Sequence, residues 1–261
     1  MKKQLRLVLF AMLIAILVVM AAIGVSAETT DADEIANGNY YKVVSDTDGT
    51  VLGYYATLAD AVGAIQADGY TVTVLSDVTE SAAITLSNAH AYSISGGEQG
   101  ATITFSNTST NGPITLTAGS VTFDNVTVAT TVSVKYLFYA NGASALTLND
   151  FKTSVAASDN TVYANKAVAL TVSGTKTDIS GAVKGFFNAV KAANGTVTVT
   201  GGKIASGGYI IMLQSAMTVN ITGGELIGGN DAMFRHNSSR ASVDGSAISI
   251  TALVRVGYNR L

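Results

Sequence analysis

Apolar and polar residues alternate in short segments that recur through most of the chain. Each segment reads apolar, any residue, apolar, polar, and then Gly, Asn or Asp. Alternation with a period of two residues is typical of a β-strand with one buried face. The copies are residues 92–96, 121–125, 146–150, 170–174, 197–201, 219–223 and, with Ala at its first position, 241–245. Their nearly regular spacing along the chain indicates stacked structural repeats.

The Gly, Asn or Asp at the fifth position predicts a sharp corner after each strand, because these residues tolerate a positive φ. A second apolar stretch precedes the marked strand in several copies. Its positions are residues 136–139, 186–187, 209–213 and 233–234. Two or three short strands per repeat predict an all-β fold, a single-stranded right-handed parallel β-helix or solenoid. One buried column of this β-helix is expected to contain Leu146, Leu170, Val197 and Val219.

Two other elements are expected before the repeats. Residues 40–44 and 51–55 flank an Asp-Gly turn, which predicts a β-hairpin. Residues 57–68 predict an amphipathic α-helix that begins at an N-cap, Thr57, and stops at Gly69. An open β-helix end would expose backbone groups and apolar side chains. We therefore expect the hairpin and the helix to cover that end.

Residues 55–79 run from this helix into a first strand at Val72-Thr-Val-Leu. This segment resembles the cap helix and first strand of bacterial β-helix proteins of the pectate-lyase-like (pectin-lyase fold) superfamily. With the repeats, the resemblance covers residues 40–261 and implies the fold. Members of the group include polysaccharide lyases, hydrolases, adhesins and proteins of unknown role, so the fold alone does not choose an activity.

The N-terminus predicts export. A basic start, Lys2, Lys3 and Arg6, precedes the apolar residues 7–25, and Ala27 ends a small-x-small cleavage site. A cleaved signal peptide over residues 1–27 is the favoured interpretation, and a retained membrane anchor is the alternative because the apolar stretch is long enough to span a bilayer. In either case the rest of the protein is expected to be secreted or at the cell surface.

The expected organisation is therefore a signal peptide at residues 1–27, a segment with hairpin and cap helix at residues 28–70, and β-helix repeats at residues 71–261. The chain has no cysteine, so disulfides do not contribute to its stability. Nothing near Leu261 resembles a cap. Either a longer natural protein or an open end that pairs with another chain is expected.

Charge is unevenly distributed and suggests one candidate binding site. The formal net charge is −3, yet residues 235–261 contain four arginines and one aspartate. The shift of the sequence that superimposes Arg235 on Arg255 also superimposes Arg240 on Arg260. This match predicts two stacked pairs that could hold the carboxylates of an acidic polysaccharide. The alternatives are solvation, pairing with Asp231 and Asp244, or contact with residues 28–98 of another copy, which contain eleven carboxylates and only Lys42 as a basic residue. The arginines are Arg235, Arg240, Arg255 and Arg260.

No catalytic or metal-binding residue is assigned from the sequence. Asp124, Asp150 and Asp244 lie at corner positions, where they are expected to be solvated turn residues. His90 and His236 lack a partner set for catalysis or for zinc, so no cofactor is expected; calcium at the corners remains an alternative without assigned residues. The acidic balance argues against nucleic acid.

These observations favour a non-catalytic extracellular module with a structural or adhesive role, which binds glycans along its flank. The alternative is a polysaccharide lyase or glycoside hydrolase that is degenerate or incomplete in this chain. A minor candidate for sugar stacking is the group of hairpin tyrosines, of which one ring in each adjacent pair must face the core. These tyrosines are Tyr40, Tyr41, Tyr54 and Tyr55.

Overall fold

A computed structural model gives the structure of the protein. It describes residues 29–107, 111–190, 195–213, 217–229, 234–236, 247–250 and 255–258. The chain divides into two compact units, Met1–Asn37 and Gly38–Leu261. The described part of the first unit contains helix α2 (Asp31–Ala36), which begins with a capping box between Thr30 and Asp33. The predicted signal peptide or anchor, residues 1–27, lies outside the described residues.

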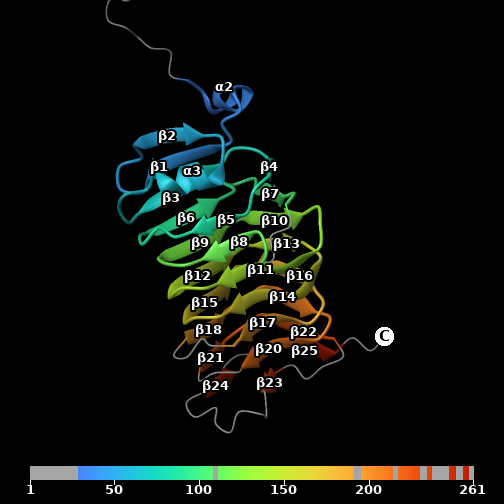
Figure 1. Ribbon diagram of the computed structural model, residues 1–261. Helices are drawn as coiled ribbons and strands as arrows, with labels where there is room; N and C mark the ends of the chain where they lie inside the picture. Colours follow the sequence, from blue (N-terminus) through green and yellow to red (C-terminus); the bar gives the residue numbers. More distant parts are fainter. Residues whose placement is uncertain are drawn as a thin grey trace, which may run out of the picture. The chain divides into compact units, whose positions relative to one another are not determined.

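The second unit is a parallel β-solenoid built from three stacks of strands (Figure 1). The first face contains β3 (Tyr70–Val74), β6 (Ala91–Ser95), β9 (Ser120–Asp124), β12 (Ser144–Asn149), β15 (Val168–Ser173), β18 (Gly195–Val199), β21 (Met217–Ile221) and β24 (Ala247–Ile250). The second face contains β4 (Val78–Glu80), β7 (Ala101–Phe105), β10 (Val126–Thr130), β13 (Lys152–Ser154), β16 (Asp178–Ala182), β19 (Lys203–Ser206), β22 (Glu225–Gly228) and β25 (Arg255–Tyr258). The third face contains β5 (Ile84–Leu86), β8 (Ile114–Leu116), β11 (Val134–Ala140), β14 (Ala157–Ala164), β17 (Gly185–Ala189), β20 (Tyr209–Leu213) and β23 (Phe234–His236).

The first face consists of the strands that the sequence repeats predicted. Leu146 pairs with Leu170, Leu170 with Val197, and Val197 with Val219, all in parallel register. These side chains are fully buried, so the predicted column is confirmed. Each contributes on the order of 2 kcal/mol through burial, and each needs the turns above and below it to be covered. The parallel β-helix is therefore confirmed, with a strand on each of three faces.

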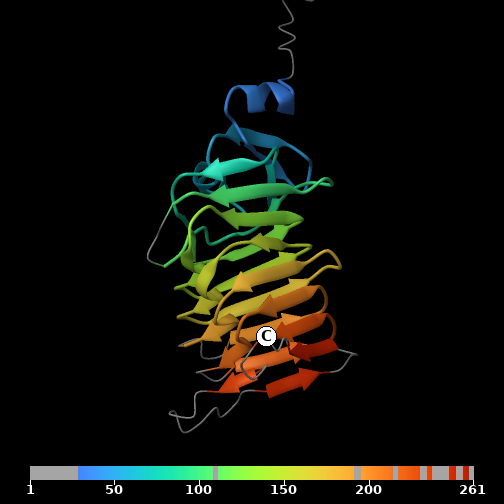
Figure 2. The ribbon, with the colours of Figure 1, turned by 90° about the vertical axis from the view of Figure 1, so that its right-hand side faces the viewer.

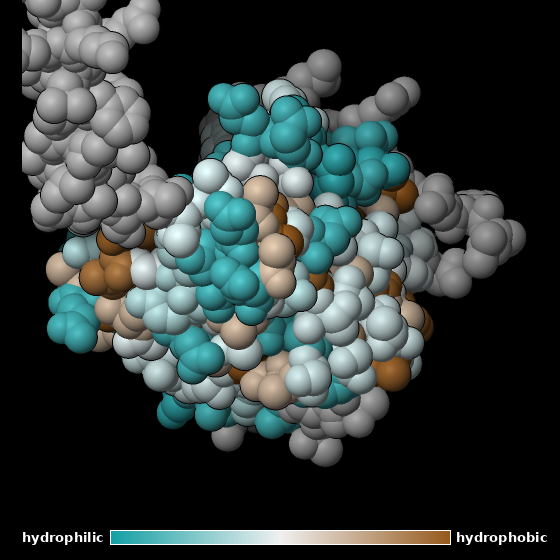
Figure 3. All heavy atoms as spheres, turned by 90° about the horizontal axis from the view of Figure 1, so that it is seen from above, coloured by the Kyte–Doolittle hydropathy of each residue, from teal (hydrophilic) through white to brown (hydrophobic). Residues whose placement is uncertain are grey.

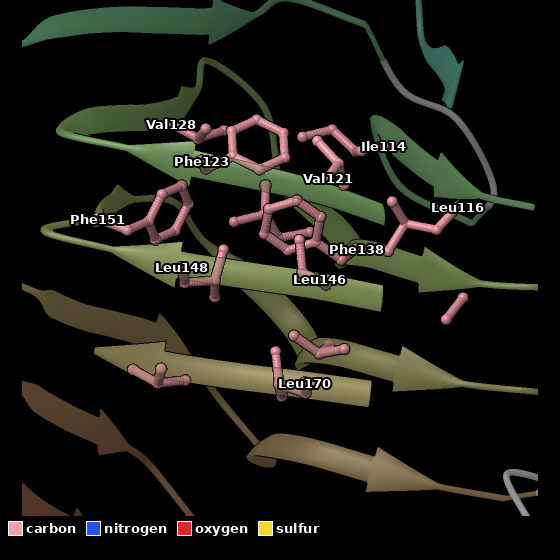
Figure 4. Packing of buried hydrophobic residues seen from close by; sticks show 14 of the residues in the cluster. Ile114, Leu116, Val121, Phe123, Val128, Phe138, Leu146, Leu148, Phe151 and Leu170 are labelled. Atoms are coloured by element: carbon pink, nitrogen blue, oxygen red, sulfur yellow. The ribbon is translucent and has the colours of Figure 1, made fainter. Parts of the chain in front are cut away.

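The core between the three faces is apolar and closely packed (Figure 4). Its centre contains Phe123 of the first face and Phe138 of the third face, with ring centroids 5.4 Å apart in an edge-to-face arrangement. Phe151, from the corner after β12, lies 5.9 Å from each of the other two rings. Aromatic rings prefer such tilted contacts. They come from three places on the chain and tie two successive turns together.

The predicted corner conformation is correct in some repeats and wrong in others. Asn125, Asp150 and Gly174 have positive φ values of 50°, 47° and 84°, as expected. In the repeats that end in two glycines, the second one takes the positive φ instead. These residues are Gly97, Gly202 and Gly224, so the assignment to Gly96, Gly201 and Gly223 is wrong. A glycine pair allows either residue to make the turn, which a pattern of residue types cannot resolve.

The N-terminal end of the solenoid is covered as predicted. Strands β1 (Tyr41–Ser45) and β2 (Val51–Tyr55) form an antiparallel hairpin, and β1 extends the first face by pairing antiparallel with β3. Helix α3 (Leu58–Gly63) has Thr57 as its N-cap and contributes Leu58, Ala61 and Val62 to the core. The helix ends before the predicted Gly69. The side chain of Asn88 donates to the carbonyl of Val62 in the last turn of the helix and to that of Ile65 just after it, at 3.0 and 2.8 Å.

The last repeat differs from the prediction. The strand paired with β21 is β24, in which Ile248 lies opposite Val219. The predicted seventh copy at residues 241–245 is therefore not the next first-face strand, and it lies outside the described residues. Its alternation was the weakest of all copies, since alanine stands at the first apolar position.

Candidate functional site

Only two of the four candidate arginines can be placed in the fold. Arg235 lies in β23 on the third face, and Arg255 lies in β25 on the second face. Arg240 and Arg260 lie outside the described residues. The candidate arginine site is thus located only through the backbone register of Arg235 and Arg255.

The expected stacking of Arg235 on Arg255 is wrong. Arg235 pairs with Met212 of β20, whereas Arg255 pairs with Glu225 of β22. The shift that superimposes the two arginines in sequence therefore leads from the third face to the second face, not to the next turn of one face. The pattern could not reveal this difference, because strands on all three faces alternate inward and outward residues in the same way.

Arg235 lies at the end of a row of residues in register on the third face. In order, the row contains Thr85, Thr115, Tyr139, Tyr163, Asn188, Met212 and Arg235. Adjacent strands are about 4.8 Å apart, so the backbones of Tyr163 and Arg235 are separated by roughly 14 Å. The register thus connects a predicted arginine with aromatic residues that the sequence analysis missed.

Tyr136, Tyr139 and Tyr163 form a stacked group on the outside of the third face, which we call the tyrosine cluster. The rings of Tyr136 and Tyr163 are 4.3 Å apart and 18° from parallel. Tyr139 lies 6.1 Å from Tyr136 and 5.9 Å from Tyr163, again with nearly parallel rings. Tyr139 and Tyr163 are partly exposed, while Tyr136 is only 5% exposed. The cluster therefore offers a half-covered aromatic surface to solvent.

The shape of the strands explains why these rings converge. Leu137 and Phe138 are adjacent in sequence, yet both are fully buried in the core. Successive residues of a regular strand point to opposite sides, so β11 must bend between Tyr136 and Tyr139. The register of β11 against β14 is regular from Tyr136 to Tyr139, so β14 follows the same path, and it is irregular only before it, between Val134 and Tyr136. The bend brings the two flanking tyrosines together on the outside.

A buried hydrogen-bond network lies next to the tyrosine cluster and connects β14 with the following turns of the third face. The side-chain amide of Asn160, which is fully buried, donates to the hydroxyl of Tyr209 at 2.8 Å and to the carbonyl of Gly185 at 3.2 Å. Asn188 donates to the same hydroxyl at 3.3 Å. The ring of Tyr209 lies across Gly185, where a Cβ atom would be only 2.1 Å from it. This glycine is therefore required for the close packing of the ring.

Charged groups surround the tyrosine cluster. The ammonium group of Lys135 lies 5.1 Å from the centre of the Tyr136 ring, a cation–π contact. Lys184 and Asp159 form an ion pair of 2.9 Å on the neighbouring turns. Burial, assisted by the carboxylate of Asp159, raises the pKa of Tyr136 to about 12. The phenol of Tyr136 is thus a neutral hydrogen-bonding group at neutral pH.

The sequence contains a signal for this cluster that we did not recognise. Tyr139 and Tyr163 are separated by the same stretch of chain as Leu146 and Leu170, which is one repeat of the solenoid. Residues 136–139 were noted as an apolar stretch, but Tyr163 stands in a segment, residues 157–164, that was not expected to be a strand. Asn160 and Asp159 make that segment more polar than a typical strand.

The corner between the first and second faces contains a separate polar hollow of about 170 Å³. Asp77, Asp150 and Lys152 line it together with Asn125. Both carboxylates have structural partners, since Asp77 accepts the backbone N–H of Thr102 at 2.7 Å and Asp150 accepts that of Lys176 at 2.9 Å. Asp124, another corner residue, accepts a 2.6 Å hydrogen bond from Asn149. These contacts link neighbouring turns. Asp244 lies outside the described residues.

The hairpin tyrosines mostly contribute to packing. Tyr41 is fully buried, and Tyr40 and Tyr55 pack against the core. Tyr54 is partly exposed and lies opposite Lys42, whose ammonium group is 5.8 Å from its ring. The expectation that one ring of each pair faces inward is correct for Tyr41.

The two histidines have different surroundings. His90 lies beside Asp68, with 3.3 Å between its Nδ1 and the carboxylate, at an exposed turn near the cap. His236 is the last residue of β23, on the third face. Over the side chains that the structure describes, no group of three or more His, Cys, Asp or Glu residues could hold a metal ion. No helix in the described ranges is long and apolar enough to cross a membrane.

The chain is a parallel β-solenoid with a hairpin and helix at its N-terminal end. No protein-family model matches it, and neither does a curated protein or a solved structure.

Proposed function

We propose that the protein is a non-catalytic extracellular adhesive module of the pectate-lyase-like superfamily, and that it binds an acidic glycan on its third face. The observation that carries this proposal is the tyrosine cluster, with Lys135 at its edge and Arg235 further along the same row. The export signal in the sequence supports an extracellular location, and the cap at the N-terminal end agrees with the resemblance to this superfamily.

The chemistry of the surface suits a sugar chain. Apolar faces of sugar rings pack against aromatic rings, and the partly exposed Tyr139 and Tyr163 provide such surfaces. Lys135 is exposed at the edge of the cluster and can attract a carboxylate. Strands on this face repeat about every 4.8 Å, so a polymer that runs along the solenoid meets several turns at once. The spacing from the cluster to Arg235, roughly 14 Å, would span a few sugar units.

The experiment compares retention of purified protein on polygalacturonate and on a neutral polysaccharide, at low and at high salt. A variant with Tyr139→Ala and Tyr163→Ala should lose binding to polygalacturonate. Lys135→Gln and Arg235→Gln should each weaken binding mainly at low salt, because salt screens charges outside the protein core. Tyr54→Ala and Arg255→Gln are matched controls, since both residues lie away from the third face.

Equal retention of the double tyrosine variant and the unaltered protein would overturn the proposal, provided that their thermal unfolding temperatures agree. Loss of binding in Arg255→Gln but not in Arg235→Gln would instead assign the glycan to the second face. The neutral polysaccharide separates the contribution of the aromatic rings from that of charge.

A second candidate function is a polysaccharide lyase or hydrolase that acts at the polar hollow. The observation in its favour is the presence of Asp77, Asp150 and Lys152 around one cavity. It is tested by incubating the protein with pectate, alginate and chondroitin while following unsaturated products and reducing ends. Product formation that disappears in Asp150→Asn would replace the adhesive proposal with an enzymatic one.

A further inference from the structure

The second face has a row of residues whose charges alternate in sign from one turn to the next. Lys152 pairs with Asp178, Asp178 with Lys203, Lys203 with Glu225, and Glu225 with Arg255. We call the first four residues the charge row. Strands of this face lie one above another in Figure 2, so the row runs along the length of the solenoid.

The side chains of the charge row face solvent. Lys152 and Asp178 are exposed, and Lys203 and Glu225 are partly exposed, while the next residue of β16, β19 and β22 is buried in the core. No ion pair joins two of these four side chains in the part of the chain with described side chains. Their charged groups are therefore open to contacts from outside.

The positions beside the charge row are mostly occupied by small residues. Two residues further along the strands, the outward positions are Thr104, Ala129, Ser154, Ala205 and Ile227. No charged side chain stands on this side of the row to hold a partner away; on the other side, two residues before Asp178, Lys176 is exposed. A flat partner surface could therefore approach the charge row closely.

We propose that two copies of this chain associate through their second faces, in antiparallel orientation, with the charge rows in contact. A two-fold axis along the strand direction, between the levels of Asp178 and Lys203, sets Asp178 of each copy against Lys203 of the other. It also sets each Lys152 against Glu225 of the other copy. All four contacts then join opposite charges, as a closed symmetric dimer requires.

Other arrangements of the same faces are unfavourable. A parallel pair related by a two-fold axis along the solenoid would place each residue of the charge row against its own copy, and like charges would meet. Arg255 lies one strand beyond the row and, in the antiparallel dimer, would meet the level of Thr127, which is uncharged. The alternation thus selects the antiparallel orientation, and the proposed register is the one in which all four residues of the charge row meet an opposite charge.

The size of the face predicts a weak dimer. Strands of about four residues over some seven turns cover on the order of 400 Å² per copy, which is at the lower end for specific interfaces. Association should therefore be transient and sensitive to salt. This dimer does not depend on glycan binding, because it uses the second face and the proposed glycan surface is on the third.

The test uses single and paired charge reversals, with association measured by sedimentation equilibrium at low and high salt. Asp178→Lys alone, or Lys203→Asp alone, puts like charges together at two contacts and should weaken self-association about tenfold or more. A mixture of these two single variants restores all four opposite-charge contacts, so it should form a mixed dimer as readily as the unaltered protein.

The double variant with Asp178→Lys and Lys203→Asp distinguishes dimerisation from charge attraction between neighbouring turns of one molecule. Every contact between the two copies still joins opposite charges. Within one copy, however, the charge row now has two positive residues followed by two negative ones, so like charges are neighbours. Retained association with lower or equal thermal stability supports the proposal. A monomeric unaltered protein at all concentrations, or single variants that associate as well as it does, would overturn the proposal.

Discussion

The hydroxyl of Tyr41 donates a 2.6 Å hydrogen bond to Glu80, and the same carboxylate oxygen accepts the backbone N–H of Leu58 at 2.8 Å. Glu80 is 6% exposed, so these contacts lie inside the N-terminal cap. One carboxylate therefore connects the hairpin, the first turn of helix α3 and the first strand of the second face. The N-terminus of a helix favours a negative group at this position.

Replacement of Glu80 by Ala should destabilise the protein by about 3 kcal/mol, because it leaves a buried hydroxyl and a buried N–H without an acceptor. Urea unfolding measures this loss. Tyr41→Phe removes only one of the two contacts and should cost about 1 kcal/mol. An unfolding midpoint for Glu80→Ala equal to that of the unaltered protein would show that the cap does not depend on this carboxylate.

The corner glycines differ in the space that surrounds them, and their substitutions should rank accordingly. A Cβ atom at Gly223 would be 2.4 Å from the carbonyl oxygen of Thr200, whereas one at Gly201 would be 3.3 Å from that of Gly174. Backbone atoms of adjacent turns cannot separate without breaking the hydrogen bonds between the stacked strands. Gly223→Ala should therefore cost about 2 to 3 kcal/mol and Gly201→Ala less than about 1 kcal/mol. Thermal unfolding of the two variants in the reverse order would contradict this explanation.

Gly185→Ala should displace the ring of Tyr209, because the new methyl group would lie within 2.1 Å of it. Asn160 then loses the hydroxyl to which it donates, and the expected cost is about 1 to 2 kcal/mol. Binding to polygalacturonate should also weaken if the surface next to the tyrosine cluster takes part. Gly63→Ala in helix α3 is a control with open space around the new methyl group, and it should not destabilise the protein.

Several tyrosines should titrate above the ordinary value of about 10. Burial raises the pKa of Tyr41, Tyr92 and Tyr163, and that of Tyr136 to about 12. The folded form then holds protons that the unfolded form releases, so the contribution of these tyrosines to the free energy of unfolding should be constant below pH about 10 and fall as the pH rises toward 12. Ultraviolet difference spectra of phenolate formation measure the titration. Tyr136→Phe should remove one late-titrating group; an unchanged titration curve would contradict its assignment.

The hydropathy of the surface suits a protein that contacts its partners mainly through polar side chains. Seen from above in Figure 3, the coloured surface is mainly hydrophilic or neutral, with hydrophobic residues scattered among them. Among the residues with described side chains, the large hydrophobics that are well exposed are Val51, Leu52 and Val183. The glycan surface and the dimer surface proposed above accordingly depend on specific aromatic and charged residues, not on a broad apolar patch.

The sequence by itself determined the β-helix, its first face and its cap. Most strands of the first face repeat as apolar-x-apolar and are followed within two residues by Gly, Asn or Asp, so local pattern and burial agree, as at Val197 and Val219. The hairpin and the N-cap at Thr57 are likewise local features with recognisable turn and capping residues. Such features depend on residues within a few positions of one another and can therefore be recognised from the sequence.

Only the tertiary structure decided which residues meet across turns. The strands of the second face are short and less apolar, and the corners between faces vary in length, so a fixed shift along the sequence cannot assign a residue to a face. This is why Arg235 and Arg255 were paired wrongly, and why the tyrosine cluster and the charge row were not found. Both features arise from parallel register between segments about one turn apart, which is a property of the stacked backbone and not of any single segment.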